Sequence, residues 1–97
     1  MISNTARAAF YLAVLDERAG DFDAAIAGYG RVLAIDDGVE VADDALWWRA
    51  RLLEQEARLA DARKAYAELI DRFSGSEFAP EARFRLAEAL EHQGEHG

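Results

Sequence analysis

The chain contains no cysteine, and proline occurs only once among its 97 residues. Without cysteine, disulfides and thiolate metal sites are excluded, but the compartment stays open, because reducing and oxidising locations both tolerate this absence. A single proline in a chain rich in alanine, leucine, glutamate and arginine is typical of an all-helical protein. No run alternates apolar and polar residues with period two, so strands are not expected. The composition predicts one small all-α domain.

Basic residues and long apolar runs are also scarce. The 11 lysines and arginines face 19 aspartates and glutamates, which gives a net charge of -8. Nucleic acids and anionic membrane surfaces are therefore unfavourable partners, since both are bound largely through basic side chains. No segment approaches the ~18 apolar residues of a membrane span, and the N-terminus lacks a basic region followed by an apolar core. The expected protein is soluble, without membrane insertion.

Groups that catalyse reactions or bind metals are few. The two histidines, His92 and His96, both fall within the last six residues. Their spacing of four would align them on a helix, but Gly94 lies between them, so a frayed tail is the favoured interpretation over a metal site. Ser74 and Ser76 flank a glycine and are typical of a turn and a helix cap. No catalytic residue, metal or cofactor is predicted, and the chain is not expected to be an enzyme.

The sequence repeats itself when it is shifted by 37 residues without a gap. Small, aromatic and acidic residues return at the same positions of the period, and Gly20 aligns with Ala57 and Gly94. The aligned columns are Ala8, Ala45 and Ala82; Phe10, Trp47 and Phe84; Ala13, Ala50 and Ala87; and Glu17, Glu54 and Glu91. We therefore divide a single domain, residues 1–97, into repeat one (6–42), repeat two (43–79) and a half repeat (80–97).

Each unit is predicted to be a helical hairpin. The first helix spans about residues 5–19, with Ser3 or Asn4 as N-cap, and ends at Gly20. A second helix follows with an apolar stripe at helical spacing, and polar, glycine-bearing segments link the units. Ser76 is expected to cap the fifth helix and Pro80 to occupy its first turn. The fold class is an α-solenoid of antiparallel hairpins, with five helices in two and a half repeats.

The run AGDFDAAIAGYGRVLAID resembles the centre of a tetratricopeptide repeat. The matching residues are Gly20, Asp21, Phe22, Ala25, Tyr29, Val32 and Leu33. The family's usual period is 34, and the longer period here, with the text DRFSGSEFAPEARFRLAEALEHQGE, is similar to a subclass found in bacterial envelope proteins of the Tol-Pal-associated and outer-membrane assembly type. The resemblance implies a non-catalytic protein-interaction scaffold, periplasmic or envelope-associated if it belongs to that subclass and otherwise cytoplasmic. An alternative is a helical accessory region of an envelope enzyme such as a lytic transglycosylase.

Two adjacent tryptophans stand in the run DDALWWRARLLE. Neighbouring helical residues point about 100° apart, so Trp47 and Trp48 cannot share one narrow core stripe. Leu46, Ala50 and Leu53 supply that stripe, and the tryptophans are expected on the concave face that first helices line. Phe10, Trp47 and Phe84 are predicted to form an aromatic column there, which either anchors a peptide or only packs on itself. The predicted partner-binding residues are Arg7, Phe10, Tyr11, Val14, Asp44, Trp47, Trp48, Arg51, Glu81, Phe84, Arg85 and Glu88.

The expected partner is a protein or peptide. The carboxylate-gripping pocket of the resembled family is not reproduced, and the acidic column of Glu17, Glu54 and Glu91 favours a basic or apolar segment. The fifth helix has no following helix to cover it. Either the chain belongs to a longer array, or this helix acts as a cap or self-associates to form a homo-oligomer. The predicted self-association edge is Leu86, Ala89 and Leu90.

Overall fold

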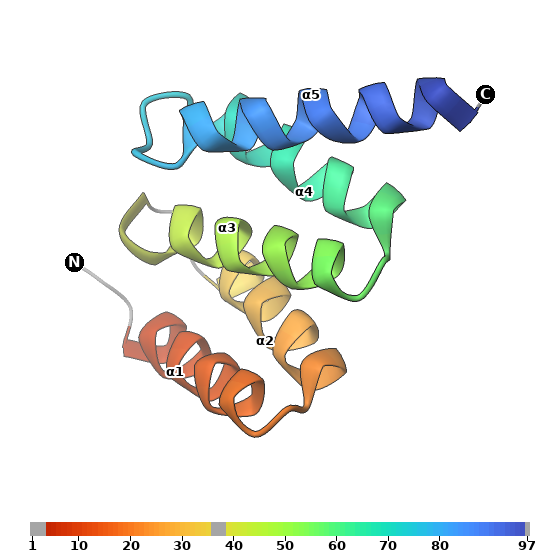
Figure 1. Cartoon of the computed structure of the whole chain (residues 1–97). Coiled ribbons are helices and arrows are strands. Elements are labelled where there is room, and N and C mark those ends of the chain that lie inside the picture. The colour runs from red at the N-terminus through yellow and green to blue at the C-terminus, as the bar shows by residue number, and fades with distance from the viewer. Residues whose placement is uncertain (1–3, 36–38, 97) are drawn as a thin grey trace.

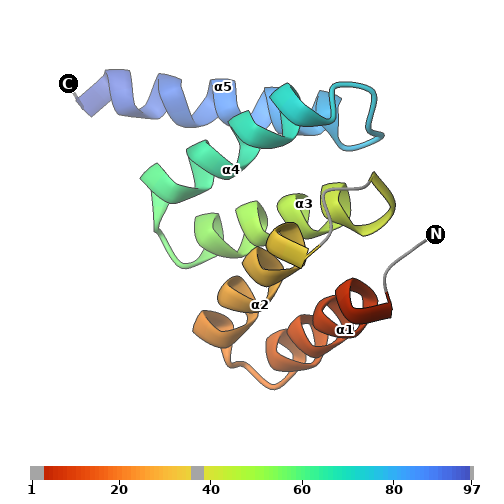
Figure 2. The ribbon, with the colours of Figure 1, turned by 180° about the vertical axis from the view of Figure 1, so that it is seen from behind.

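The computed structural model describes the backbone of residues 4–35 and 39–96, and these ranges form five helices. The helices are α1 (Asn4–Arg18), α2 (Phe22–Ile35), α3 (Val39–Gln55), α4 (Leu59–Arg72) and α5 (Ala79–His96). Consecutive helices pack as hairpins, and α1, α3 and α5 form one layer with α2 and α4 behind it (Figures 1 and 2). The predicted all-α stack of two and a half hairpins is confirmed. Ser3 and the side chains of Asn4, His92 and His96 lie outside the described part of the chain, and with them the expected N-cap of α1.

Both hairpin turns use the same helix-ending geometry. Gly20 has φ 82°, its N–H donates to the Glu17 carbonyl (3.0 Å), and the Asp21 N–H donates to the Asp16 carbonyl (2.9 Å). In the second unit Ala57 has φ 60°, with equivalent bonds from Ala57 to Glu54 (3.0 Å) and from Arg58 to Leu53 (2.8 Å). This pair of bonds closes a helix when one residue adopts the left-handed conformation. The second turn therefore places a Cβ where glycine is preferred.

Replacing Ala57 with glycine is expected to raise the free energy of unfolding by about 1 kcal/mol, because the left-handed conformation no longer strains a Cβ. Gly20→Ala, the matched change in the first unit, is expected to lower it by a similar amount. Urea unfolding followed by circular dichroism measures both variants. Changes of the same sign would show that the two turns are not equivalent.

The core is built from small residues where helices of one unit meet. Ala13 and Gly28 are buried at the contact between α1 and α2. A Cβ added to Gly28 would lie 2.9 Å from the Ala13 Cβ, closer than side chains approach one another. The two helices therefore approach closely at Gly28. Gly30 is half-buried, and a Cβ there would meet the Arg49 Nε at an ordinary 3.5 Å.

The two glycines of α2 are therefore expected to respond to alanine with opposite signs. Gly28→Ala overpacks the contact with Ala13 and should lower the free energy of unfolding by about 1 kcal/mol after the gain in helix propensity is included. Gly30→Ala has room for its methyl group and should raise that free energy by about 0.5–1 kcal/mol. Thermal unfolding of both variants decides the matter, and a stabilised Gly28→Ala variant would contradict the close approach.

The loop from α4 to α5 is fixed by Ser76. Its Oγ accepts the Phe78 N–H (3.1 Å) and donates to Asp43 Oδ2 (2.8 Å), which joins the loop to the start of α3. Its carbonyl accepts the Ala79 N–H (3.1 Å), and Pro80 is the second residue of α5. The prediction for Pro80 is confirmed, and the capping prediction for Ser76 is refined, since its side chain bonds the N–H of the residue before the helix.

The three residues of the predicted self-association edge of α5 differ in exposure. Leu86 and Ala89 are half-buried on the side of α5 that meets α4, and Leu86 packs against the core. Helical spacing places them with the buried Ala79 and Ala82, away from the open side. Leu90, the third residue of that edge, is 53% exposed. The uncovered face of α5 thus lies around Leu90 rather than around Leu86.

Candidate functional site

The two adjacent tryptophans of α3 have different surroundings. Trp47 is only 7% exposed, and its ring stacks on Phe78 with centroids 5.3 Å apart and planes 9° apart. It also meets the ring of Tyr66 at 5.9 Å, and the Arg51 Cζ lies 5.6 Å from its centroid. Trp48 is 41% exposed. Trp47 is thus a packing residue, and only Trp48 presents a broad surface to a partner.

The predicted aromatic column of Phe10, Trp47 and Phe84 is not a continuous stack. The rings of α1 and α3 pack instead on the second helix of their own unit, as Phe10 does on Tyr29 with centroids 5.6 Å apart. Trp47 makes the equivalent contact with Tyr66. Phe84 is 60% exposed, because no helix follows α5 in the described part of the chain. The repeat position is therefore used for packing within each hairpin.

A buried tyrosine and a glutamate form the same hydrogen bond in both units. The Tyr29 hydroxyl donates to Glu17 Oε1 (2.7 Å), and the Tyr66 hydroxyl donates to Glu54 Oε1 (2.6 Å). Burial, followed by the hydrogen bond and the negative charge of the glutamate, raises the pKa of each tyrosine well above its ordinary value of 10.0. Sequence reasoning treated these glutamates only as an acidic column. The signal was available, because both units separate the glutamate and the tyrosine by 12 residues.

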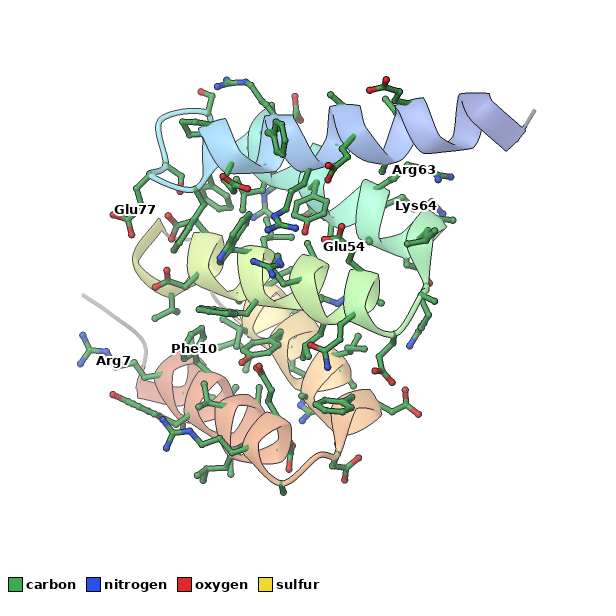
Figure 3. The ribbon with its side chains drawn as sticks, viewed as in Figure 1. Arg7, Phe10, Glu54, Arg63, Lys64 and Glu77 are labelled. Carbon is green, nitrogen blue, oxygen red and sulfur yellow. The ribbon has the colours of Figure 1, made fainter. Side chains whose placement is uncertain are left out.

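Two arginines further balance the charge of Glu54. Arg85 Nη1 donates to Glu54 Oε1 (3.4 Å), and Arg51 Nε lies 4.0 Å from the same oxygen. The buried Nε of Arg85 lies 3.2 Å from Glu81 Oε2. The two groups form an ion pair, but the N–H of Arg85 is not aligned for a hydrogen bond. Figure 3 shows Glu54 between α3 and α5. This carboxylate is therefore already partnered and contributes less to attracting a basic segment than Glu17 does.

Two adjoining hollows follow the layer of α1, α3 and α5, and both are lined by Glu17 and Trp48. The hollow on the α1 side holds about 230 Å³ and is lined by Phe10, Val14, Glu17, Arg18, Tyr29 and Trp48. Its neighbour holds about 240 Å³ and is lined by Glu17, Trp48, Arg51, Leu52, Glu54, Gln55 and Arg85. We call the two hollows together the Trp48 cleft. The exposed ring of Trp48 is common to both halves.

The Trp48 cleft brings together some of the predicted binding residues. The predicted residues that line it are Phe10, Val14, Trp48, Arg51 and Arg85. Figure 3 shows Phe10 extending from α1 toward α3. The residues that do not line it are Arg7, Tyr11, Asp44, Trp47, Glu81, Phe84 and Glu88. Lining residues that were not predicted as binding residues are Arg18, Tyr29, Leu52 and Gln55, besides the two glutamates of the acidic column. Arg18, Leu52 and Gln55 come from the ends of α1 and α3, beyond the predicted stripe, and Tyr29 comes from α2.

Two of the predicted binding residues outside the cleft, Arg7 and Asp44, lie in the N-terminal halves of their helices. Asp44 is half-buried beside the loop that follows α4, and burial, together with the charges of Asp43 and Glu77, raises its pKa. Arg7 extends away from the helices in Figure 3. A larger hollow of about 490 Å³ lies at that loop, but it is lined by Asp43, Arg72 and loop residues 73–77, and it offers no exposed aromatic ring. The aromatic anchor belongs to the Trp48 cleft.

Among the residues whose side chains are described, no group of three or more histidines, aspartates and glutamates is placed to hold a metal ion. In the same part of the chain, no helix combines the length and the apolar character needed to cross a bilayer.

The comparison with protein families decides the classification. The model of the tetratricopeptide repeat matches residues 12–77 and again residues 49–97. The two matches begin 37 residues apart, which is the period of the sequence. The chain belongs to the tetratricopeptide repeat family. None of the curated proteins matches this tetratricopeptide repeat chain by sequence. Repeats of this family generally mediate protein–protein interactions and are typically non-catalytic scaffolds.

Proposed function

We propose that this tetratricopeptide repeat protein is a non-catalytic interaction module that binds a segment of a partner protein in the Trp48 cleft, on the concave face of the array. The exposure of Trp48 between two hollows is the observation that carries the proposal. A large ring with few rotatable bonds gives much contact area for little loss of entropy, and tryptophan is enriched among residues that dominate binding energy. The rings buried around Trp47 keep α3 rigid beneath it.

The lining of the cleft supports an apolar or basic segment. On the α1 side, the hollow suits an apolar side chain, because it is lined by Phe10, Val14 and Trp48. Glu17 lines the same hollow and is the carboxylate that a partner can reach there. A lysine or arginine of the partner would pair with Glu17 and stack on Trp48. On the α5 side, Arg51 and Arg85 already hold Glu54. The basic group is therefore assigned to the α1 half of the cleft.

Selection of a random-peptide display library on the wild-type protein tests this proposal. Peptides that bind the wild type are expected to bind Trp48→Ala about 30-fold more weakly, the equivalent of roughly 2 kcal/mol for an interface anchor. Leu59→Ala is the matched control, because Leu59 is 49% exposed on α4, outside the cleft. Equal loss of binding in the two variants, or selected peptides that ignore both changes, would contradict binding in the Trp48 cleft.

We further propose that the chain belongs to the long-period subclass found in bacterial envelope proteins. The 37-residue period and the geometry of residues 73–82 support this assignment, since Ser76 and Pro80 form an ordered entry to α5. An envelope or periplasmic location follows from the subclass. Fractionation of cells that express the full-length gene product tests it, and recovery of the protein in the cytosol would count against the assignment.

A further inference from the structure

The uncovered face of α5 carries a pattern that the other first helices do not have. Successive helical residues are spaced by about 100° around the axis. One side of α5 is centred on Ala87, and four other residues point within about 60° of it: Arg83, Phe84, Leu90 and Glu91. All five are exposed. We call these five residues the α5 face. The helix α5 itself lies at the opposite end of the stack from α1 in Figure 1.

The corresponding positions of α1 and α3 are covered by a helix. Ala87 aligns with Ala13 and Ala50, which are both fully buried against the second helix of their hairpins. At Ala13 the two backbones approach so closely that only glycine fits opposite, at Gly28. An alanine at the centre of a helix face thus marks the point of closest helix approach in this fold. The α5 face has the same centre and no cover within the described residues.

Arg83 shows that the missing cover is not another helix of the α2 or α4 type. Its equivalents in α1 and α3 are Ala9 and Leu46, both buried beneath those helices. A charged side chain at this position would be desolvated without a partner under such an apolar cover. In the described part of the chain, neither Arg83 nor Glu91 forms an ion pair. The occupant must therefore supply an acid opposite Arg83 and a base opposite Glu91.

We propose that the occupant is the α5 face of a second copy, packed antiparallel about a two-fold axis at Ala87. This arrangement places Arg83 of one copy against Glu91 of the other, twice, and Phe84 against Leu90, twice. The two Ala87 residues meet at the axis, where small side chains let the helices approach. An isologous contact requires such self-complementarity, and five exposed residues of one helix provide it. The inference is independent of the Trp48 cleft, to which α5 contributes Arg85 and no residue of the α5 face.

One helix pair is a small interface, so the expected dimer is weak and forms at roughly 0.1–1 mM protein. Sedimentation velocity over this range should show the wild type passing from monomer to dimer. Arg83→Glu alone and Glu91→Arg alone should remain monomeric, because each homodimer would place like charges in contact. An equimolar mixture of the two variants should dimerise again, since a mixed pair restores opposite charges at both ends. Circular dichroism confirms that both variants fold.

A covalent test fixes the position of the axis. The chain has no cysteine, so Ala87→Cys provides a single thiol at the proposed axis. Under mild oxidation it should form the disulfide-linked dimer about ten times faster than Ala67→Cys, an exposed alanine of α4. Equal rates for the two thiols, a wild type that stays monomeric at 1 mM, or a dimer unaffected by both charge reversals would each overturn the proposal. Binding of a peptide of residues 58–73 to the α5 face of the monomer would also overturn it, by assigning the face to an α4-type helix.

Discussion

Trp47→Ala is expected to lower the free energy of unfolding by about 3–5 kcal/mol, the usual cost of deleting a large buried aromatic side chain. Its ring lies between Tyr66 of α4 and Phe78 of the loop, so its loss leaves a void where repeat two joins α5. A chain of 97 residues has a total stability of only about 5–15 kcal/mol. The variant should therefore unfold at a much lower urea concentration than the wild type.

Trp48→Ala is the control for this prediction, because the two tryptophans are adjacent on the same helix. A ring that keeps much of its surface in water contributes less to the core, so the expected loss is below about 1 kcal/mol. Urea unfolding followed by circular dichroism at the helix band compares the two variants. Equal losses would show that Trp47 does not hold the scaffold.

Replacing both Tyr29 and Tyr66 with phenylalanine is expected to lower the free energy of unfolding by about 2–4 kcal/mol. Each change removes a hydrogen bond to a carboxylate, worth roughly 1–2 kcal/mol here, because the glutamates retain contact with water or with arginine. The two sites lie in different hairpins, so the single losses should add. Urea unfolding of the single and double variants measures these losses. A loss in the double variant well below the sum of the two single losses would contradict the independence of the two sites.

The same bonds predict a loss of stability at alkaline pH. The pKa of each tyrosine is raised in the folded state, so the stabilisation is fully present below the ordinary pKa of about 10 and falls as pH rises above it. In a Tyr11→Phe background the two remaining tyrosines are this buried pair. Ultraviolet difference absorbance should then show phenolate forming together with the loss of helical circular dichroism. Ionisation with the helices intact would contradict the prediction.

The repeat made the fold predictable, because local signals agreed in two copies. Gly20 ended the first helix, and its aligned partner Ala57 adopts the same left-handed conformation although alanine disfavours it. The core stripe of Leu46, Ala50 and Leu53 is fully buried as expected. The helix ends and the core stripe follow from residue spacing within one helix, and the second unit repeats the pattern of the first.

The candidate site was less predictable, because its arrangement depends on contacts between units. Helical spacing separated Trp47 from Trp48, but which of the two is buried depends on Tyr66 of α4 and on the loop after α4, which brings Phe78 onto Trp47. Charge counting likewise assigned Glu54 to a free acidic column, whereas Arg85 of the next unit contacts it across the stack. Contacts of this kind have no periodic signal in a single sequence. They moved the candidate site toward the C-terminal halves of α1 and α3.

We propose that the two adjacent tryptophans have different roles: Trp47 stabilises the scaffold, and Trp48 contacts the partner. Since the chain contains only these two tryptophans, Trp47→Phe and Trp48→Phe each leave one fluorescent reporter. Acrylamide quenching with and without a library-selected peptide is the most direct test. Trp48 should be readily quenched when free and protected by the peptide, while Trp47 should be protected in both states. Equal quenching of the two reporters, or peptide protection at Trp47 alone, would contradict the account.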